Sequence, residues 1–139
     1  MTAICDTGPL VAYLNSRDPY HKWAVAVMKQ VLPPMHTCEP VLTEALYFLR
    51  EDGLDVDPLF KLLERGALRV QFEVATHWPR IRILMGRYRQ MDLADASIVV
   101  MSELHRRSEV LTVDRKDFSI YRKNDRQMID FVAPPAAEL

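Results

Sequence analysis

Four acidic side chains, scattered along the chain, are the strongest candidates for chemistry: Asp6, Glu44, Asp95 and Asp114. If they meet in one place, their ionised carboxylates repel one another, and some would be protonated at neutral pH unless the charge were compensated. A hard divalent cation such as Mg²⁺ or Mn²⁺ compensates it, because these ions prefer oxygen ligands. Such an ion can activate a water and stabilise charge on a phosphate. The four acids therefore predict metal-dependent phosphodiester hydrolysis without a protein nucleophile.

Asp6 and Glu44 also have ordinary structural explanations. Asp6 follows a hydrophobic run and precedes a helix, so it could simply cap that helix. Strand ends are where parallel sheets bind ligands, however, and this favours a functional Asp6. Glu44 lies off the apolar stripe of its helix, where a surface glutamate is the default. The neighbouring Thr7 could orient a carboxylate or a water through its hydroxyl, or form a plain turn hydrogen bond.

The remaining acids come in two closely spaced pairs. Asp92 and Asp95 are three residues apart, which places both on one face at the start of a helix. We assign the N-cap to Asp92 and the inward role to Asp95, whose charge the helix dipole favours. In the second pair, Asp114 ends a predicted strand and is the better site candidate. Asp117 is expected to be a cap or turn residue, or to join an outer shell of the site.

The elements that must position these acids alternate along the chain. Short hydrophobic or alternating segments predict strands over 1–5, 35–39, 67–72, 109–113 and 128–132. Apolar residues at helical spacing, with proline and glycine at the boundaries, predict helices over 10–14 and 20–32, between Pro40 and Asp52-Gly53, between Asp57 and Gly66, and over 77–89 and 92–107. This alternation predicts an α/β fold in three layers, α/β/α, with a central parallel sheet.

Length and composition describe an ordinary globular protein. The 139 residues, 49% hydrophobic and 27% charged, suit one domain, expected over 1–133 and followed by a disordered tail over 134–139. No apolar run approaches the roughly twenty residues of a membrane span, and no secretory signal opens the chain, so we expect a cytoplasmic protein without membrane contact. Cys5 and Cys38 are expected to be buried, reduced thiols, and no Cys/His spacing resembles a zinc site.

The charge is unevenly distributed although the net charge is only −1. Segment 77–126 holds eleven basic and seven acidic residues, a balance of +4, which leaves −5 for the rest of the chain. Basic residues near an acidic site can bind phosphates. On charge alone, the favoured interpretation is that these arginines coat solvated helix faces.

At the acidic residues the chain resembles PIN domains, and among them the VapC toxins of bacterial toxin–antitoxin pairs. Four pieces of sequence, in this order, cover nearly the whole chain. They are Asp6-Thr7-Gly8-Pro9-Leu10, Thr43-Glu44-Ala45, Asp92-Leu93-Ala94-Asp95-Ala96-Ser97 and Leu111-Thr112-Val113-Asp114-Arg115-Lys116-Asp117-Phe118. Each piece alone is weak, but the four together are fairly specific.

The resemblance implies a flavodoxin-like α/β/α fold and an endoribonuclease that depends on Mg²⁺ or Mn²⁺. It carries the family's metal-binding acids over to Asp6, Glu44, Asp95 and Asp114, while Asp92 and Asp117 match common flanking acids. It also implies an RNA substrate, a homodimer and a cognate antitoxin that wraps the toxin and obstructs its active site.

Three alternatives remain open at this stage. Asp6-Thr7-Gly8 is also the short signature of aspartic proteases, which are all-β, whereas helical spacing runs through this chain. A phospho-acceptor receiver domain has the same type of sheet, but it requires an acidic pair after the first strand, where this chain has only Asp6. It also requires a lysine after a late strand, and Lys116 matches that position only approximately. The third alternative is a non-catalytic PIN-like module that binds RNA or serves as a scaffold.

Overall fold

A parallel sheet forms the centre of the protein. A computed structural model describes residues 1–136. In this part the central sheet has five strands in the order β3-β2-β1-β4-β7, and all neighbouring pairs are parallel. The predicted fold class is confirmed. The strands are β1 (Thr2–Cys5), β2 (Met35–Cys38), β3 (Leu68–Phe72), β4 (Ser108–Leu111) and β7 (Phe131–Val132).

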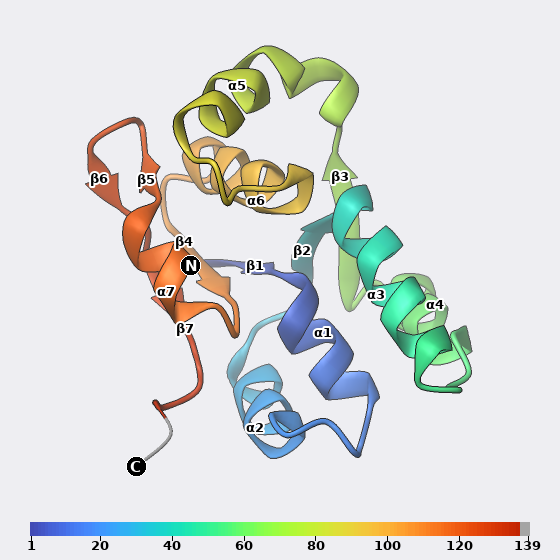
Figure 1. The fold of residues 1–139 in the computed structure, drawn as a ribbon. Helices are drawn as coiled ribbons and strands as arrows, with labels where there is room; N and C mark the ends of the chain where they lie inside the picture. Colours follow the sequence, from blue (N-terminus) through green and yellow to red (C-terminus); the bar gives the residue numbers. More distant parts are fainter. Residues whose placement is uncertain (137–139) are drawn as a thin grey trace.

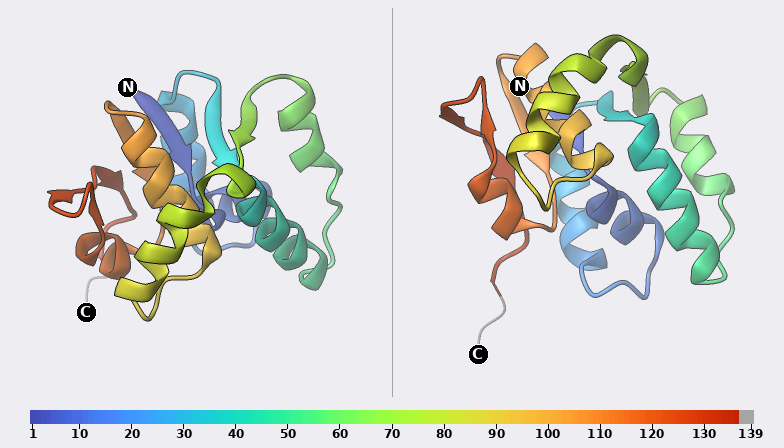
Figure 2. Two further views of the ribbon diagram at one scale, coloured as in Figure 1. Left: turned by 90° about the horizontal axis from the view of Figure 1, so that it is seen from above. Right: turned by 45° about the horizontal axis from the view of Figure 1, so that its top comes forward.

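Helices cover both faces of this sheet. In Figure 1, α5 and α6 lie above the sheet and α1 and α2 below it. Seen from above in Figure 2, α3 and α4 lie on one side of the molecule, and α7 lies with the C-terminal hairpin on the other. The helices are α1 (Thr7–Leu14), α2 (His21–Gln30), α3 (Glu39–Glu51), α4 (Asp57–Glu64), α5 (Val74–Arg87), α6 (Leu93–Leu104) and α7 (Arg115–Ile120).

Helix α6 is the hydrophobic centre of the upper layer. It packs against β1, β2 and β4 on one side and against α5 on the other. Because it is enclosed in this way, its buried residues run from Ala96 to Ser102 without interruption. Helix α3 contacts α6 as well as α1, so it joins the two helical layers. The N-terminal ends of α1 and α6 and the first half of α3 are thereby held in a tightly packed frame.

The C-terminal third differs from the sequence-based expectation. Strand β4 ends at Leu111 instead of continuing to Val113, and the short helix α7 was not predicted. The final strand predicted over 128–132 is divided. Its beginning belongs to β6 (Gln127–Met128), which pairs antiparallel with β5 (Arg122–Lys123), while its end forms β7 in the main sheet. Elements of two to six residues are too short to show a period.

Several smaller expectations can also be compared with the structure. The basic helix predicted over 77–89 starts earlier, at Val74, and accommodates Pro79 in its interior. Cys5 and Cys38 are buried and free, as predicted. None of the helices in the described part has the length and apolar composition needed to cross a bilayer. The division into a domain over 1–133 and a disordered tail stays a prediction, since the last three residues lie outside the described part.

Candidate metal centre

Three of the four predicted site acids line one pocket at the carboxyl end of β1. Asp6 follows the strand directly, Glu44 comes from α3, and Asp95 comes from the first turn of α6. Their helices meet here because α3 touches both α1 and α6. We call this pocket the acid pocket, after the three carboxylates of Asp6, Glu44 and Asp95 that line it. Residues 38 and 89 positions from Asp6 are thus brought together by the sheet order and the helix packing.

Asp6 is the most enclosed member of the acid pocket, with 7% of its surface exposed. Its Oδ1 accepts a hydrogen bond from the Thr7 backbone N–H at 2.9 Å, so it does cap α1. Its Oδ2 accepts a hydrogen bond from the Thr112 hydroxyl at 2.8 Å. The pKa of Asp6 is raised to about 6, chiefly by burial and also by the nearby Glu44 and Asp92 carboxylates, while the two hydrogen bonds act to lower it. Asp6 therefore both caps α1 and lines the acid pocket, so the two interpretations of this residue do not exclude each other.

Glu44 is fixed by the residue next to Asp6. Its Oε1 accepts a hydrogen bond from the Thr7 hydroxyl at 2.7 Å. Burial raises the pKa of Glu44, the Thr7 hydrogen bond lowers it, and the neighbouring Asp92 raises it again. Thr7 therefore orients a carboxylate, one of the two roles considered for it from sequence.

Asp95 and Asp92 divide their roles as the sequence predicted. Asp92 caps α6, because its side chain accepts a hydrogen bond from the Asp95 backbone N–H at 2.8 Å. Asp95 faces the pocket, and its Oδ2 accepts a hydrogen bond from the Tyr121 hydroxyl at 2.7 Å. Burial raises the pKa of Asp95 to about 7. The Tyr121 hydrogen bond lowers it, while Asp92, Asp6 and Asp114 raise it.

Asp114 lies outside the residues that line the acid pocket. It is not the end of β4, as expected from sequence, but the N-cap of α7, where its side chain accepts a hydrogen bond from the Asp117 backbone N–H at 3.0 Å. Asp117, expected to be a cap or turn residue, is instead inside that helix. The Asp114 backbone N–H donates to the Thr112 hydroxyl oxygen at 3.0 Å, so one hydroxyl links Asp114 to Asp6. Asp114 thus adjoins the pocket without lining it.

Two polar side chains that the sequence did not single out support the acids. Thr112 and Tyr121 are fully buried and donate hydrogen bonds to Asp6 and Asp95, respectively. Thr112 stands 106 residues from its partner. Neither the threonine nor the tyrosine lies in a local sequence pattern that predicts such a pairing. The position of Thr112 one residue beyond a strand that neighbours β1 is the only hint that the chain offers.

Gly8 keeps the pocket open at the start of α1. A Cβ atom built on Gly8 would collide with the side chain of Val113, which also lines the pocket. Any larger residue here would therefore force the Val113 side chain to shift. This close approach explains a glycine in the first turn of a helix, where glycine is otherwise unfavourable.

Acidic side chains dominate the lining of the acid pocket, and a cation lies at its rim, where the Arg17 guanidinium donates to the Asp52 backbone carbonyl at 2.8 Å. Its lining contains five carboxylates, the further two being Asp18 and Asp52, and no lysine or arginine. Within residues 1–136, no group of three or more His, Cys, Asp or Glu side chains is arranged so that it could hold a metal ion. Mg²⁺ typically uses one or two protein carboxylates and keeps several waters, so an open set of hard oxygen donors fits such an ion. Asp6, Glu44 and Asp95 are the residues that would hold it.

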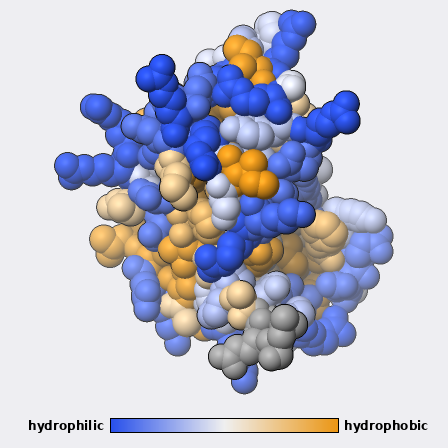
Figure 3. Space-filling model, turned by 60° about the vertical axis from the view of Figure 1, so that its left-hand side comes forward, coloured by the Kyte–Doolittle hydropathy of each residue, from blue (hydrophilic) through white to orange (hydrophobic). Residues whose placement is uncertain are grey.

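The basic residues of segment 77–126 are partly committed elsewhere. Arg80 forms two hydrogen bonds with Glu103, at 3.0 and 2.7 Å, and one with Asp125 at 2.8 Å. Arg87 binds the same Asp125 oxygen at 2.6 Å. We call these four residues the arginine network; it ties the β5–β6 hairpin to α5 and α6. Figure 3 shows hydrophilic side chains projecting at the height of α5 and this hairpin, with more hydrophobic surface below.

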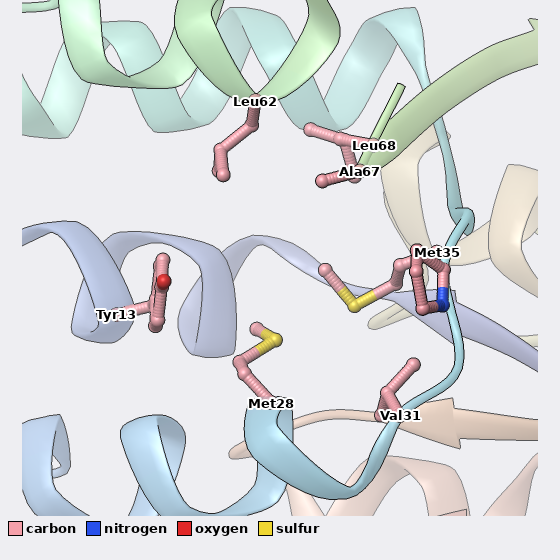
Figure 4. A pocket seen from close by; sticks show the side chains of 8 residues that line it. Tyr13, Met28, Val31, Met35, Leu62, Ala67 and Leu68 are labelled. Carbon is pink, nitrogen blue, oxygen red and sulfur yellow. The ribbon is translucent and has the colours of Figure 1, made fainter. Parts of the chain in front are cut away.

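A second pocket is apolar and lacks acids. It is lined by side chains of α1, α2 and α4 and of the segments entering β2 and β3, and in Figure 4 Tyr13, Met28 and Leu62 converge on it from the three helices. Met35 and Leu68 are further lining residues. Without a charged or metal-binding group, this pocket cannot perform the hydrolysis expected from the sequence, so the acid pocket is the candidate active site.

Comparison with known proteins agrees with this fold. The family model described as PIN domain matches residues 3–124. No curated protein sequence matches the chain. A solved structure described as a toxin–antitoxin complex from Klebsiella pneumoniae superimposes with a TM-score of 0.65 at 21% identity, covering 85% of this chain and 91% of that one. The parallel sheet excludes the all-β aspartic protease. The chain belongs to the PIN domain family.

Proposed function

We propose that the protein is an endoribonuclease that depends on Mg²⁺ or Mn²⁺ and acts as the toxin of a toxin–antitoxin pair. The observation that carries the proposal is the meeting of Asp6, Glu44 and Asp95 in a pocket whose lining contains no basic side chain. Their raised pKa values indicate that the ionised forms are poorly compensated without a cation. The PIN family supports a nuclease, because PIN domains are generally nucleases.

Each residue has a defined task in this mechanism. Asp6, Glu44 and Asp95 would hold the ion, Thr7 orients Glu44, and Thr112 and Tyr121 orient the other two carboxylates. The bound ion would supply an activated water and stabilise charge on the scissile phosphate. Asp114 contributes a nearby negative charge and, through Thr112, helps to position Asp6. The reaction needs no protein nucleophile.

The proposal also covers the protein's partner, its oligomeric state and its location in the cell. The structural neighbour from Klebsiella pneumoniae is itself described as a toxin–antitoxin complex, which supports an antitoxin as partner. A homodimer rests on the family resemblance, and sedimentation of the purified protein would test it. Two free, buried cysteines agree with a reducing cytoplasm, where thiols stay reduced.

An RNA cleavage assay tests the proposal. With Mg²⁺, wild type should cut RNA, and Asp6→Asn and Asp95→Asn should each lower kcat/KM at least about a hundredfold, or about 3 kcal/mol of transition-state stabilisation. Glu44→Gln has a matched control in Glu51→Gln, an exposed glutamate on the same helix outside the pocket, which should cut like wild type. Equal cleavage by all variants would refute the site, and no cleavage by wild type would favour a non-catalytic RNA-binding or scaffold module.

A further inference from the structure

Two exposed aromatic side chains line the acid pocket beside its carboxylates. Phe48 comes from α3 and Tyr20 from the connection that leads into α2. Their surfaces are 51% and 42% exposed. A single exposed aromatic residue is unremarkable on a protein surface. Here, however, both aromatic side chains line the pocket that contains three candidate metal ligands, so they are placed to contact a molecule bound there.

Phe48 is held in a defined place relative to the acids. It follows Glu44 by four residues on α3, so the two side chains are neighbours on one helix face. The ring of Tyr47 lies nearly parallel to that of Phe48, with centroids 5.5 Å apart and 11° between the planes. Phe48 therefore presents a flat, uncharged surface about one helical turn from a candidate metal ligand.

The charge of the pocket limits what can lie on that surface. Five carboxylates line the pocket, and they repel the phosphates of a nucleic acid wherever no cation intervenes. A nucleobase is uncharged and has a π face, and stacking on aromatic side chains is the usual way in which proteins bind unpaired bases. The arrangement suits a nucleotide whose phosphate lies at the ion and whose base lies on the aromatic surface.

We propose that Phe48 is a substrate-positioning residue on which a base next to the scissile phosphate stacks, with Tyr20 as a second aromatic wall. This inference rests on the proposed ribonuclease function and assigns a residue that positions its substrate. In an RNA duplex the bases already stack on one another and are not free to lie on Phe48. The enzyme should therefore cut unpaired RNA and spare the same sequence in a duplex.

Steady-state cleavage of a short unpaired RNA tests the role of Phe48. Phe48→Leu keeps an apolar side chain but removes the aromatic face, and should raise KM about 5- to 100-fold with little change in kcat. Phe48→Trp should restore KM to within about twofold of wild type. Phe60→Leu is the matched control, since Phe60 on α4 is 47% exposed and does not line the pocket. A wild-type KM in Phe48→Leu would overturn the proposal and leave Phe48 to a protein partner.

A binding experiment separates this inference from the nuclease proposal. Wild-type protein is mixed, with Mg²⁺ present, with a short RNA that carries a non-hydrolysable analogue of the phosphodiester and a fluorescent base analogue whose emission falls on stacking. We expect quenching that the change Phe48→Leu abolishes. Quenching that is equal in both proteins, or absent from both, would overturn the inference even if wild type cuts RNA. Quenching by Phe48 together with no cleavage by wild type would instead refute the nuclease and retain the base site.

Discussion

Carboxyl groups in the acid pocket and in the arginine network have pKa values that are shifted in opposite directions. Within the network, Asp125 accepts hydrogen bonds from Arg80 and Arg87, and these lower its pKa. In the pocket, burial and neighbouring acids raise the pKa of Asp6 and Asp95 to about 6 and about 7. The network is complete without any further group, whereas the pocket leaves negative charge uncompensated. In a structural site the charged side chains are paired with one another, whereas a binding site can contain charged side chains whose partner is the ligand.

The largest stability effect should come from breaking the network. Arg80 and Glu103 keep only 25% and 11% of their side-chain surfaces exposed, so removing the arginine leaves a partly buried carboxylate without its partner. We expect Arg80→Ala to lower the free energy of unfolding by about 2 kcal/mol in urea titrations. Cleavage per folded molecule should stay at the wild-type level. Arg82→Ala, an exposed arginine on the same helix, is the control, and a loss of equal size there would contradict this prediction.

The pocket should give the metal-free protein a stability that falls as pH rises. The pKa of Asp95 is about 7 in the folded state against an ordinary value of 3.8, so between these values the native state binds more protons than the unfolded state. Stability from this group is complete below about pH 4 and lost through about pH 7. Asp125 acts oppositely, because its lowered pKa gives stability that disappears only as the solution becomes acidic.

Comparison with Asp95→Asn isolates this effect. Burial and the nearby His105 lower the pKa of His36, which works in the opposite direction near pH 6.5, so wild type alone is not informative. In EDTA, we expect the variant to gain on the order of 1 kcal/mol of stability relative to wild type between pH 5 and pH 8. Chemical denaturation at several pH values measures this gain. A difference that is constant with pH would show that Asp95 is not perturbed.

A smaller effect should follow from removing one hydroxyl group. The Tyr121 hydroxyl lowers the pKa of Asp95 by its hydrogen bond, so Tyr121→Phe should raise that pKa further. The acidic limb of the pH profile for RNA cleavage should then move to higher pH, and stability should fall by about 1 kcal/mol. Tyr13→Phe, at the apolar pocket, is the control. An unchanged pH profile with the same loss of stability would assign Tyr121 a purely structural role.

The acid pocket and the arginine network also differ in how well their residues could be predicted from the sequence. The meeting of Asp6, Glu44 and Asp95 in one pocket could be predicted because a strand end, a helix face and a helix start are local patterns, and parallel strands direct their carboxyl ends to one edge. The cap at Asp92 was equally local, and it is confirmed by the hydrogen bond to the Asp95 backbone. Predictions that needed only local geometry were therefore largely correct.

What could not be predicted depends on contacts between distant segments. Thr112 reaches Asp6 because β4 is the neighbour of β1, and no local pattern reveals that order. Tyr121 reaches Asp95 only because the unpredicted helix α7 ends beside α6. Asp114 was misplaced for a different reason: β4 ends at Leu111 and α7 begins at Arg115, and the sequence pattern did not show where these two short elements end and begin. Arg80, like Tyr121, had no visible partner until the hairpin placed Asp125 beside it.

Calorimetric titration with Mn²⁺ tests most directly whether the acid pocket is a cation site. Wild type should bind Mn²⁺ and gain stability, by about 2.7 kcal/mol when the free ion is at a hundred times its Kd. Asp95→Asn should raise that Kd at least about tenfold, whereas Arg80→Ala should leave it unchanged. Absence of Mn²⁺ binding by wild type, or the same Kd for wild type and Asp95→Asn, would contradict the assignment of these carboxylates as metal ligands.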